Sequence, residues 1–504
     1  MSKEKSIKIF DSISYALSLT AVFVFLAGCS VYIYINHEII KSAGYFSTIL
    51  SIVGLVIGKA IFYFREKKLK SSVFGKIAFA STIITLLAGL YIVVFQLILD
   101  YFQPLSTFDI PIICLGVFLF LIGLSALFSI FSGFKNNSLF FVSLLALLVF
   151  AGGAVWANVQ GYGLFNKSVD STIVFSSGEN GYATYRIPSL ALVENETDAQ
   201  NSAPKTIYAF AEGRRNSSLD NGEIDVVYKF SKDAGKTWSE SNLALNAEKW
   251  FSGKGKVSDP TPVYDKARNK LCLMFRVGLE KNNYSTVCYY IEGTINPDDT
   301  IAWDYSNIIN INEKIGMNVS PGPAKGNITD DGKIVFPVRG EGCCFIAYTQ
   351  DGAKTWRKGE AAGNAGETDF DMIDENRAVM IGRTGAMSSL PRNNHIKIAL
   401  SDDGGLTWST PLFETTLKTP VVMSSVTSKN NAIYCTHCDT YLTRANLSYS
   451  VSVDNGKNWT TTRLYDGPSG YSVAEISENE TLFIIAEIGK VEYHEEIRLF
   501  SVEV

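Results

Sequence analysis

The hydrophobic and polar positions divide the chain into two parts. Residues 1 to about 158 form long apolar runs, whereas the residues from about 161 onward are more polar and are rich in Gly, Asp, Asn and Thr. A helix needs about 20 apolar residues to cross a bilayer, and a segment in hydrocarbon must be helical to satisfy its backbone. The pattern predicts two domains, 1–158 and 161–504, with about five transmembrane helices in the first, at 13–36, 45–64, 77–99, 110–132 and 139–157.

The charges between these apolar runs predict their orientation, because cytoplasmic loops carry an excess of Lys and Arg. Basic residues cluster before the first run and between the second and third, whereas the opposite side would carry only Lys41. We therefore expect a multi-pass membrane protein with a cytoplasmic N-terminus, an all-α membrane domain and an extracellular second domain. An alternative is cleavage and lipid attachment at Cys29, within Leu26-Ala27-Gly28-Cys29, which would leave four spans and the same outward placement.

One eight-residue pattern occurs four times in the second part. Each copy has an Asp, which can accept N–H groups of its own turn, and ends on a Trp, which can anchor the turn by apolar packing. The alternating segments Ile224–Phe230 and Ile396–Leu400 precede two copies and predict strands that enter hairpin turns. Repeated hairpins favour an all-β propeller, a fold that closes on itself. The copies are 231–238 (SKDAGKTW), 349–356 (TQDGAKTW), 401–408 (SDDGGLTW) and 452–459 (SVDNGKNW).

These copies resemble the Asp box of sialidases (neuraminidases), and further motifs of that family follow in chain order along 161–504. The resemblance implies a six-bladed all-β propeller that carries the catalytic residues, while the aspartates of the boxes serve the fold. The motifs are Tyr185-Arg186-Ile187-Pro188, Ala211-Glu212-Gly213-Arg214 with Asp220 six positions later, Ser258-Asp259-Pro260-Thr261, Gly366-Glu367-Thr368, Ile381-Gly382-Arg383, Thr443-Arg444-Ala445-Asn446-Leu447, Gly470-Tyr471-Ser472 and Ile485-Ala486-Glu487.

The resemblance also implies how the substrate is bound. Arg186, Arg383 and Arg444 would clamp the carboxylate of sialic acid, since guanidinium groups match carboxylates bidentately. Glu487 would fix Arg186 and offset the repulsion among the three arginines. Arg214 would contact the substituents of the sugar ring or the carboxylate, and Asp259 would contact a ring hydroxyl.

The substrate's own carboxylate would repel a carboxylate nucleophile, and a neutral phenol avoids this repulsion. The resemblance assigns the attack on the anomeric carbon to Tyr471. A phenol with an ordinary pKa of about 10 needs a base, for which Glu367 is the candidate, and Asp220 would protonate the leaving oxygen and then activate water. We expect an exo-α-sialidase that hydrolyses sialylated glycoproteins, glycolipids or oligosaccharides with retention of configuration, without a cofactor or a metal.

Two other functions stay open. A propeller that binds sialic acid without turnover would lack Tyr471, Glu367 or Asp220, and all three are present. A trans-sialidase passes through the same intermediate, so the sequence does not separate it from a hydrolase. The net charge of −5 gives no support for a nucleic-acid partner.

The cysteines raise two smaller questions. Cys272 and Cys288 flank a predicted hairpin and could pair in an oxidising location. Cys435 and Cys438 enclose His437, but structural zinc takes four ligands. We therefore expect ordinary strand residues there and no metal site.

Overall fold

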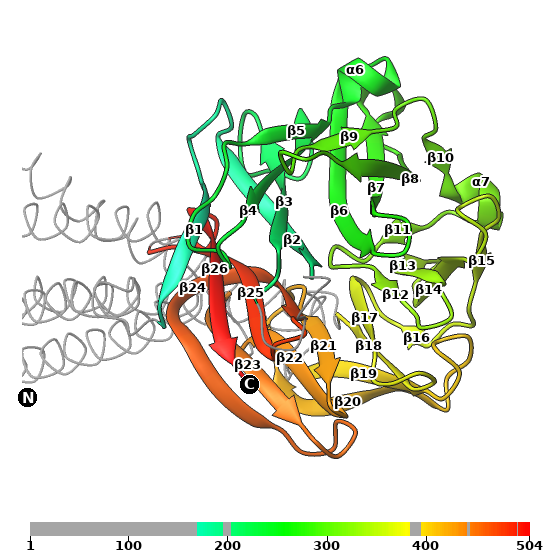
Figure 1. The fold of residues 1–504 in the computed structure, drawn as a ribbon, viewed down its shortest axis with the longest axis vertical. Helices are drawn as coiled ribbons and strands as arrows, with labels where there is room; N and C mark the ends of the chain where they lie inside the picture. Colours follow the sequence, from blue (N-terminus) through cyan, green and yellow to red (C-terminus); the bar gives the residue numbers. More distant parts are fainter. Residues whose placement is uncertain (1–168, 195–202, 384–394, 441–443, 491) are drawn as a thin grey trace, which may run out of the picture. The chain divides into compact units, whose positions relative to one another are not determined.

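The structure, a computed structural model, describes residues 169–504 except 195–202, 384–394, 441–443 and 491 (Figure 1). The predicted transmembrane spans and the boundary near 158–161 lie outside these residues, so the division into two domains stays a prediction. The helices of the described residues are short: α6 (Ala247–Phe251), α7 (Ile311–Ile315) and one 3-10 turn (Glu280–Asn282).

The described residues correct the expected fold class. Strands dominate their secondary structure, and none of their helices is long and apolar enough to cross a bilayer. We therefore withdraw the all-α multi-span membrane domain, together with the multi-pass membrane localisation, the cytoplasmic N-terminus and the extracellular catalytic domain, and describe a β fold. The expectation rested on the apolar runs and on the charges between them, and an apolar run by itself signals burial, which a protein interior satisfies as well as a bilayer does.

Four mainly antiparallel sheets hold the strands of the described residues. The first contains β2 (Thr184–Val193), β3 (Thr206–Arg214), β4 (Ile224–Ser231), β5 (Asn242–Leu245), β6 (Gly255–Asp265), β7 (Lys270–Leu279), β8 (Thr286–Ile295), β9 (Ile301–Trp303) and β10 (Ile309–Asn310). The second contains β11 (Ser320–Pro321), β12 (Asn327–Ile328), β13 (Ile334–Gly340), β14 (Cys343–Thr349), β15 (Arg357–Lys358) and β16 (Gly363–Asn364). The third contains β17 (Thr368–Met372), β18 (Ala378–Gly382), β19 (His395–Ser401) and β20 (Thr410–Lys418). The fourth contains β21 (Ser425–Lys429), β22 (Ala432–Cys438), β23 (Ala445–Ser452), β24 (Thr460–Ile476), β25 (Thr481–Ile488), β26 (Glu496–Glu503) and β1 (Ser171–Ser176).

The sheets surround a common centre (Figure 1). Strand β2 contacts β6 and β24, β12 contacts β6 and β17, and β21 contacts β17 and β24, so strands from successive parts of the chain lie next to one another around the centre. The long strand β24 serves two groups, since its first half pairs with β23 and its second half with β25. Strand β1 pairs with β26, which joins the two ends of the described chain in one sheet. This arrangement brings residues from distant parts of the sequence to one central site.

The four Asp-containing turns follow β4, β14, β19 and β23. In each turn the Asp carboxylate accepts the backbone N–H four residues later, as Asp233 does from Thr237 (2.8 Å) and Asp403 from Thr407 (2.8 Å). The predicted strands before two of these turns are confirmed as β4 and β19. The tryptophans differ in burial: Trp356 is 5% exposed, whereas the other three are only partly buried. These aspartates therefore act within their own turns.

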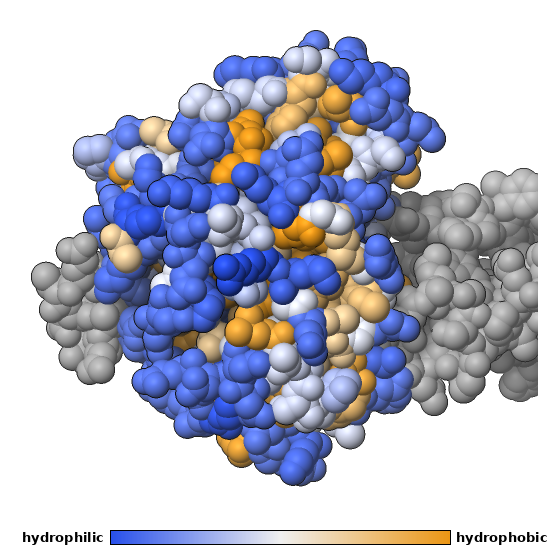
Figure 2. All heavy atoms as spheres, turned by 90° about the vertical axis from the view of Figure 1, so that its right-hand side faces the viewer, coloured by the Kyte–Doolittle hydropathy of each residue, from blue (hydrophilic) through white to orange (hydrophobic). Residues whose placement is uncertain are grey.

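The hydrophobic core lies between neighbouring sheets. Tyr290, Phe336 and Trp356 meet where the β7–β8 hairpin packs on the β13–β14 hairpin. The ring centre of Tyr290 lies 5.0 Å from that of Trp356 and 5.9 Å from that of Phe336, and the rings of Phe336 and Trp356 are 6.1 Å apart. Aromatic contacts of this kind contribute about 0.5–1.5 kcal/mol beyond the burial of the rings. On the face in Figure 2, apolar residues form separate patches among polar ones. The large aromatic clusters are internal, where they hold the strands that carry the site.

The cysteine pairing that the sequence left open does not occur. Cys272 lies opposite Glu292 and Cys288 lies opposite Arg276 in the β7–β8 register, so the two cysteines are four positions out of step, and both are free and buried. The hairpin itself is confirmed. Among the residues that the structure describes, no group of His, Cys, Asp and Glu side chains could hold a metal ion. His437 Nδ1 donates to Lys418 O (2.8 Å), and its Nε2 forms a hydrogen bond with Ser450 Oγ (2.9 Å).

Candidate active site

A tyrosine and a glutamate form the centre of the site. The Tyr471 hydroxyl on β24 donates a hydrogen bond of 2.7 Å to Glu367 Oε1, just before β17. Arg383, just after β18, donates to the other carboxylate oxygen of Glu367 and to the Tyr471 hydroxyl (3.0 Å). Tyr471 is 5% exposed and Glu367 is 8% exposed. The three side chains come from β24, from the residue before β17 and from the residue after β18.

The charges around this pair fix its protonation. Burial raises the pKa of Tyr471, and the Glu367 carboxylate raises it further against the opposing effect of three arginines. Burial also raises the pKa of Glu367, but Arg383 and then Arg339 outweigh burial and bring that pKa below its ordinary value. The resting pair is therefore a neutral phenol that donates to an ionised carboxylate, which is the arrangement needed for proton transfer from Tyr471 to Glu367.

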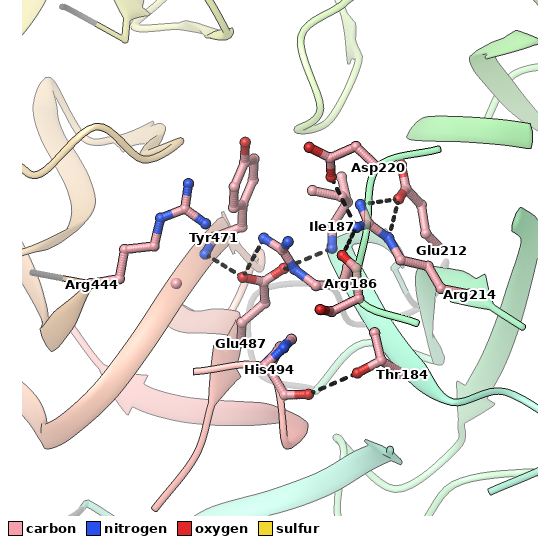
Figure 3. Close-up of polar contacts among 12 residues, drawn as sticks. Thr184, Arg186, Ile187, Glu212, Arg214, Asp220, Arg444, Tyr471, Glu487 and His494 are labelled. Atoms are coloured by element: carbon pink, nitrogen blue, oxygen red, sulfur yellow. Dashed lines mark hydrogen bonds and ion pairs between the residues drawn. The ribbon is translucent and has the colours of Figure 1, made fainter. Parts of the chain in front are cut away.

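Glu487 on β25 organises the second part of the site (Figure 3). Its two oxygens accept hydrogen bonds from Arg186 Nε (2.8 Å) and Nη2 (3.2 Å), and also from the backbone N–H groups of Ile187 (3.0 Å) and Tyr471 (3.1 Å). Burial raises the pKa of Glu487, but Arg186 outweighs it and lowers the pKa. Gly470 is needed beside Tyr471, because a Cβ atom there would collide with the Glu487 carboxylate. One buried carboxylate thus positions both an arginine and the tyrosine.

The backbone next to Arg186 is strained. Ile187 has a φ of 54°, a left-handed conformation that is rare for a β-branched residue and that marks ligand sites when it occurs. Its N–H points to Glu487 Oε1, so the carboxylate holds the unusual turn in place. The turn directs the Arg186 side chain toward Tyr471 and Glu487 (Figure 3).

Two arginines face the rings of two tyrosines. The guanidinium carbons of Arg186 and Arg444 lie 5.5 and 5.4 Å from the centre of the Tyr471 ring. They lie 5.1 and 4.9 Å from the ring of Tyr493, a residue that the sequence motifs did not indicate. Together with Arg383, these residues place three guanidinium groups around one phenol. Such a concentration of positive charge on planar donors suits a bound carboxylate.

A second cluster contains Arg214 and Asp220. Arg214 Nε and Nη2 donate to Glu212 Oε2 (3.0 and 2.7 Å), and Arg214 Nη1 lies 2.9 Å from Asp220 Oδ1. The adjacent Arg215 instead pairs with Asp225 Oδ2 (2.7 Å), as expected for neighbouring residues at a strand end. The Asp220 side chain is 79% exposed. Partial burial of the carboxyl group raises the pKa of Asp220, but the positive charges of Arg214 and then of Arg186 outweigh this effect and lower that pKa.

Asp259 connects this cluster to the central pair. Its backbone has a φ of 55°, and its N–H donates to Glu212 Oε1 (2.9 Å). Its Oδ2 lies 2.9 Å from Arg276 Nε and 3.2 Å from Arg339 Nη2. Arg339 Nη1 lies 3.5 Å from Glu367 Oε1. The predicted residues thus lie in one connected group of charges.

Three residues of this group were missed by the motifs. Glu212 stands inside the motif that indicated Arg214, two positions before that arginine, so its pairing with Arg214 could have been predicted from the motif. Arg276 on β7 and Arg339 on β13 stand near strand ends and follow no motif. Their role depends on which strands are neighbours, which local patterns do not reveal.

The chain is similar in sequence to known proteins. A family model described as a BNR repeat-like domain matches residues 205–485. A sialidase of Micromonospora viridifaciens is 20% identical over 347 residues, which cover 62% of this chain and 51% of that protein. A sialidase of Clostridium perfringens is 23% identical over 274 residues, which cover 48% of this chain and 67% of that protein. The chain therefore spans about half the length of the first of these relatives.

Solved structures show the same fold. Hadza microbial sialidase Hz136 superimposes with a TM-score of 0.56 at 20% identity, over 66% of this chain and 68% of that one. The NanB sialidase of Streptococcus pneumoniae gives a TM-score of 0.53 at 12% identity, over 66% of this chain and 70% of that one. Because the family model matches more than half of its residues, the chain belongs to the family of BNR repeat-like domains, and its relatives include sialidases.

Proposed function

We propose that this chain is an exo-α-sialidase, a glycoside hydrolase that releases terminal sialic acid from glycoproteins, glycolipids or oligosaccharides. The observation that carries the proposal is the 2.7 Å hydrogen bond from Tyr471 to Glu367, with Arg383 touching both. A buried phenol held against an ionised carboxylate among three arginines suits attack on a sugar that bears its own carboxylate. The sialidase relatives support the same substrate class.

Binding precedes the chemistry. The carboxylate of sialic acid occupies the space faced by Arg186, Arg383 and Arg444, where planar donors can each offer two N–H groups. Arg214 and Asp259 lie on the far side of the site and contact substituents of the sugar ring. Because Glu487 already holds Arg186, little of that side chain's freedom is lost on binding.

The reaction then proceeds in two displacements. Glu367 takes the phenolic proton while the Tyr471 oxygen bonds to the anomeric carbon, and the glycosidic bond breaks with a proton delivered from Asp220 to the leaving oxygen. In the second step Asp220 removes a proton from water, whose oxygen displaces Tyr471, and Glu367 returns the proton to the phenol. Two inversions give net retention of configuration.

The scaffold fits this role as a six-bladed propeller. The successive groups are β2–β5, β6–β10, β11–β16, β17–β20, β21 to the first half of β24, and the second half of β24 to β26 with β1. Each begins at the centre, and the pairing of β1 with β26 closes the last group with the start of the chain. The four Asp-containing turns lie at hairpin ends and serve as Asp boxes of the propeller.

Sialyllactose provides the test. The full chain should release sialic acid, with the α-anomer first in a proton NMR time course, and Tyr471→Phe should lose at least two decades of kcat/KM. Tyr465→Phe is the matched control, since its hydroxyl on the same strand donates to Gly489 O (2.8 Å) and not to Glu367. No release by the wild-type chain, or first release of the β-anomer, would overturn the proposal.

The same assay separates hydrolysis from transfer. With excess lactose as an acceptor, a hydrolase still yields free sialic acid, whereas a trans-sialidase yields a newly sialylated acceptor. A mutant of Trypanosoma rangeli sialidase that displays trans-sialidase activity shares this fold, with a TM-score of 0.51 at 19% identity. We expect hydrolysis, because the site is open to water at Asp220, whose side chain is 79% exposed.

A further inference from the structure

Arg339 stands between the two halves of the site. It lies on β13, a strand that carries none of the residues indicated by the sequence motifs. Its Nη2 lies 3.2 Å from Asp259 Oδ2, and its Nη1 lies 3.5 Å from Glu367 Oε1, the oxygen that accepts the Tyr471 proton. The side chain is 23% exposed. One guanidinium thus contacts both a sugar-binding carboxylate and the base.

We propose that Arg339 is a positioning residue that keeps Glu367 ionised and aims its Oε1 atom at the Tyr471 hydroxyl. This inference rests on the proposed function, because it concerns the base of that reaction. A bidentate-capable planar group can hold two carboxylates in a fixed relative position, which a single ammonium cannot do. Arg339 acts through Glu367 and needs no contact with the reacting atoms.

The division of labour on Glu367 supports this role. Arg383 contacts Oε2 of Glu367, and Tyr471 occupies Oε1. Within the part of the chain that the structure describes, Arg339 is the cationic side chain that forms an ion pair with Oε1. Without it, Oε1 would keep its single hydrogen bond from the phenol, and only Arg383 and Tyr471 would oppose rotation of the carboxylate about its terminal bond, which is a soft torsion. Arg339 therefore restricts the oxygen that must receive the proton.

Electrostatics acts in the same direction. Burial raises the pKa of Glu367, while Arg383 and then Arg339 lower it. Arg276 on β7 also carries a positive charge that interacts with Glu367, but its closest contact in the site is Asp259 Oδ2, at 2.9 Å. Removing Arg339 should raise the pKa of Glu367, so the base becomes protonated at a higher pH than in the wild type.

Arg276 offers a matched control. Both Arg339→Gln and Arg276→Gln remove a guanidinium from the same Asp259 oxygen, but only the first removes a direct contact with Glu367. A 3-fluorosialyl fluoride is the probe, because fluoride leaves with little protonation and the rate of covalent inactivation then reports on Tyr471 and its base. The rate is measured against pH for the full chain and both variants.

In Arg339→Gln, the acid limb of the inactivation profile should move to higher pH by about one unit or more, as expected for loss of an opposite charge at this distance. A one-unit shift corresponds to an about tenfold lower rate at pH values below both limbs. In Arg276→Gln the limb should move much less. A uniform loss of rate at every pH, with an unmoved limb, would reduce Arg339 to a structural residue and overturn the proposal.

Two further measurements keep the inference separate from the proposed function. Carbon-13 NMR of labelled glutamate carboxyls, with Glu367→Gln identifying the resonance, follows the titration of Glu367 without any substrate. A wild-type chain that resists the probe would refute the sialidase proposal, whereas a Glu367 titration unchanged by Arg339→Gln would refute this inference. Should Arg339→Gln fail to fold by circular dichroism, Arg339→Lys replaces it: a smaller shift in the same direction supports the role, and no shift overturns it.

Discussion

Truncation of Glu487 gives a demanding test of the central geometry. The side chain is 0% exposed, and its carboxylate accepts hydrogen bonds from Arg186, from Ile187 N–H and from Tyr471 N–H. Glu487→Ala would leave a buried guanidinium without its carboxylate and two backbone N–H groups without their acceptor. It would also remove the bond that holds Ile187 at a φ of 54°. Stability and catalysis should therefore fall together.

The size of the effect follows from the burial of the pair. Removing one partner of a buried ion pair costs about 3–5 kcal/mol, because the other charge stays desolvated. The two buried N–H groups that lose their acceptor add about 1–3 kcal/mol each. Relief of the strained turn offsets part of this cost, so we expect the loss in unfolding free energy to lie toward the upper end of the about 3–5 kcal/mol range. Arg186 would lose its fixed orientation, and we expect kcat/KM to fall by two decades or more, which is about 2.7 kcal/mol.

Urea denaturation, monitored by tryptophan fluorescence, measures the unfolding free energy, and hydrolysis of sialyllactose measures kcat/KM. Glu487→Gln keeps the shape but offers one carbonyl oxygen, so it should fall between wild type and Glu487→Ala. The control is Glu414→Ala, which removes an exposed pair with Lys397 at 4.0 Å, worth about 0–1 kcal/mol. Wild-type stability in Glu487→Ala would contradict the contacts described above. Lost stability with full turnover would show that Arg186 needs no brace, which would sink its assignment to the clamp.

Other measurements separate catalytic from structural residues. Arg444→Ala should lower kcat/KM by about two decades without changing the unfolding free energy, and near-normal turnover would contradict the clamp. Trp356→Ala should cost about 3–5 kcal/mol of stability because Trp356 is 5% exposed, while the half-buried Trp408 should cost less; equal losses would refute the difference in anchoring. The alkaline limb that reports Asp220 should lie at lower pH in kcat/KM than in kcat, because its pKa is lowered in the free enzyme; coincident limbs would contradict this. Cys343 is the half-buried one among the described cysteines, so of these six iodoacetamide should modify it first under native conditions, and earlier modification of any of the other five, detected by mass spectrometry, would contradict this.

The candidate site could be predicted because its motifs carry their own local geometry. Arg186 and Glu487 lie 301 positions apart, yet they form a buried pair, and Tyr471 reaches Glu367 over 104 positions. No periodicity in the sequence indicates such contacts. The order of the motifs along a repeated hairpin fold does indicate them, because the motifs stand on strands or at strand ends of several successive groups. The role of each residue stays a prediction until the variants are measured.

The parts that could not be predicted depend on register and on neighbouring strands. Cys272 and Cys288 were correctly placed on one hairpin, but a four-position offset separates them, and no local pattern fixes that offset. Arg276 lies opposite Ser258 on β6, beside Asp259, through strand pairing alone. A strand-end arginine on the surface and one inside a site have the same local sequence, so long-range packing decides between them.

Asp220 is the predicted catalytic residue whose surroundings suit its two tasks unequally. Its carboxylate lies 2.9 Å from Arg214, which favours the ionised form that activates water in the second step. The first step needs the protonated form, which the same ion pair opposes. We expect a bound sugar to favour the protonated form of Asp220 in the first step. A ring hydroxyl that accepts a hydrogen bond from Arg214 removes that donor from Asp220, and the exclusion of water by the sugar raises the pKa of the carboxyl group. Substrate recognition at Arg214 and protonation of Asp220 are then linked, so a glycoside that fails to engage Arg214 would bind through its carboxylate and still leave its departing oxygen without a proton.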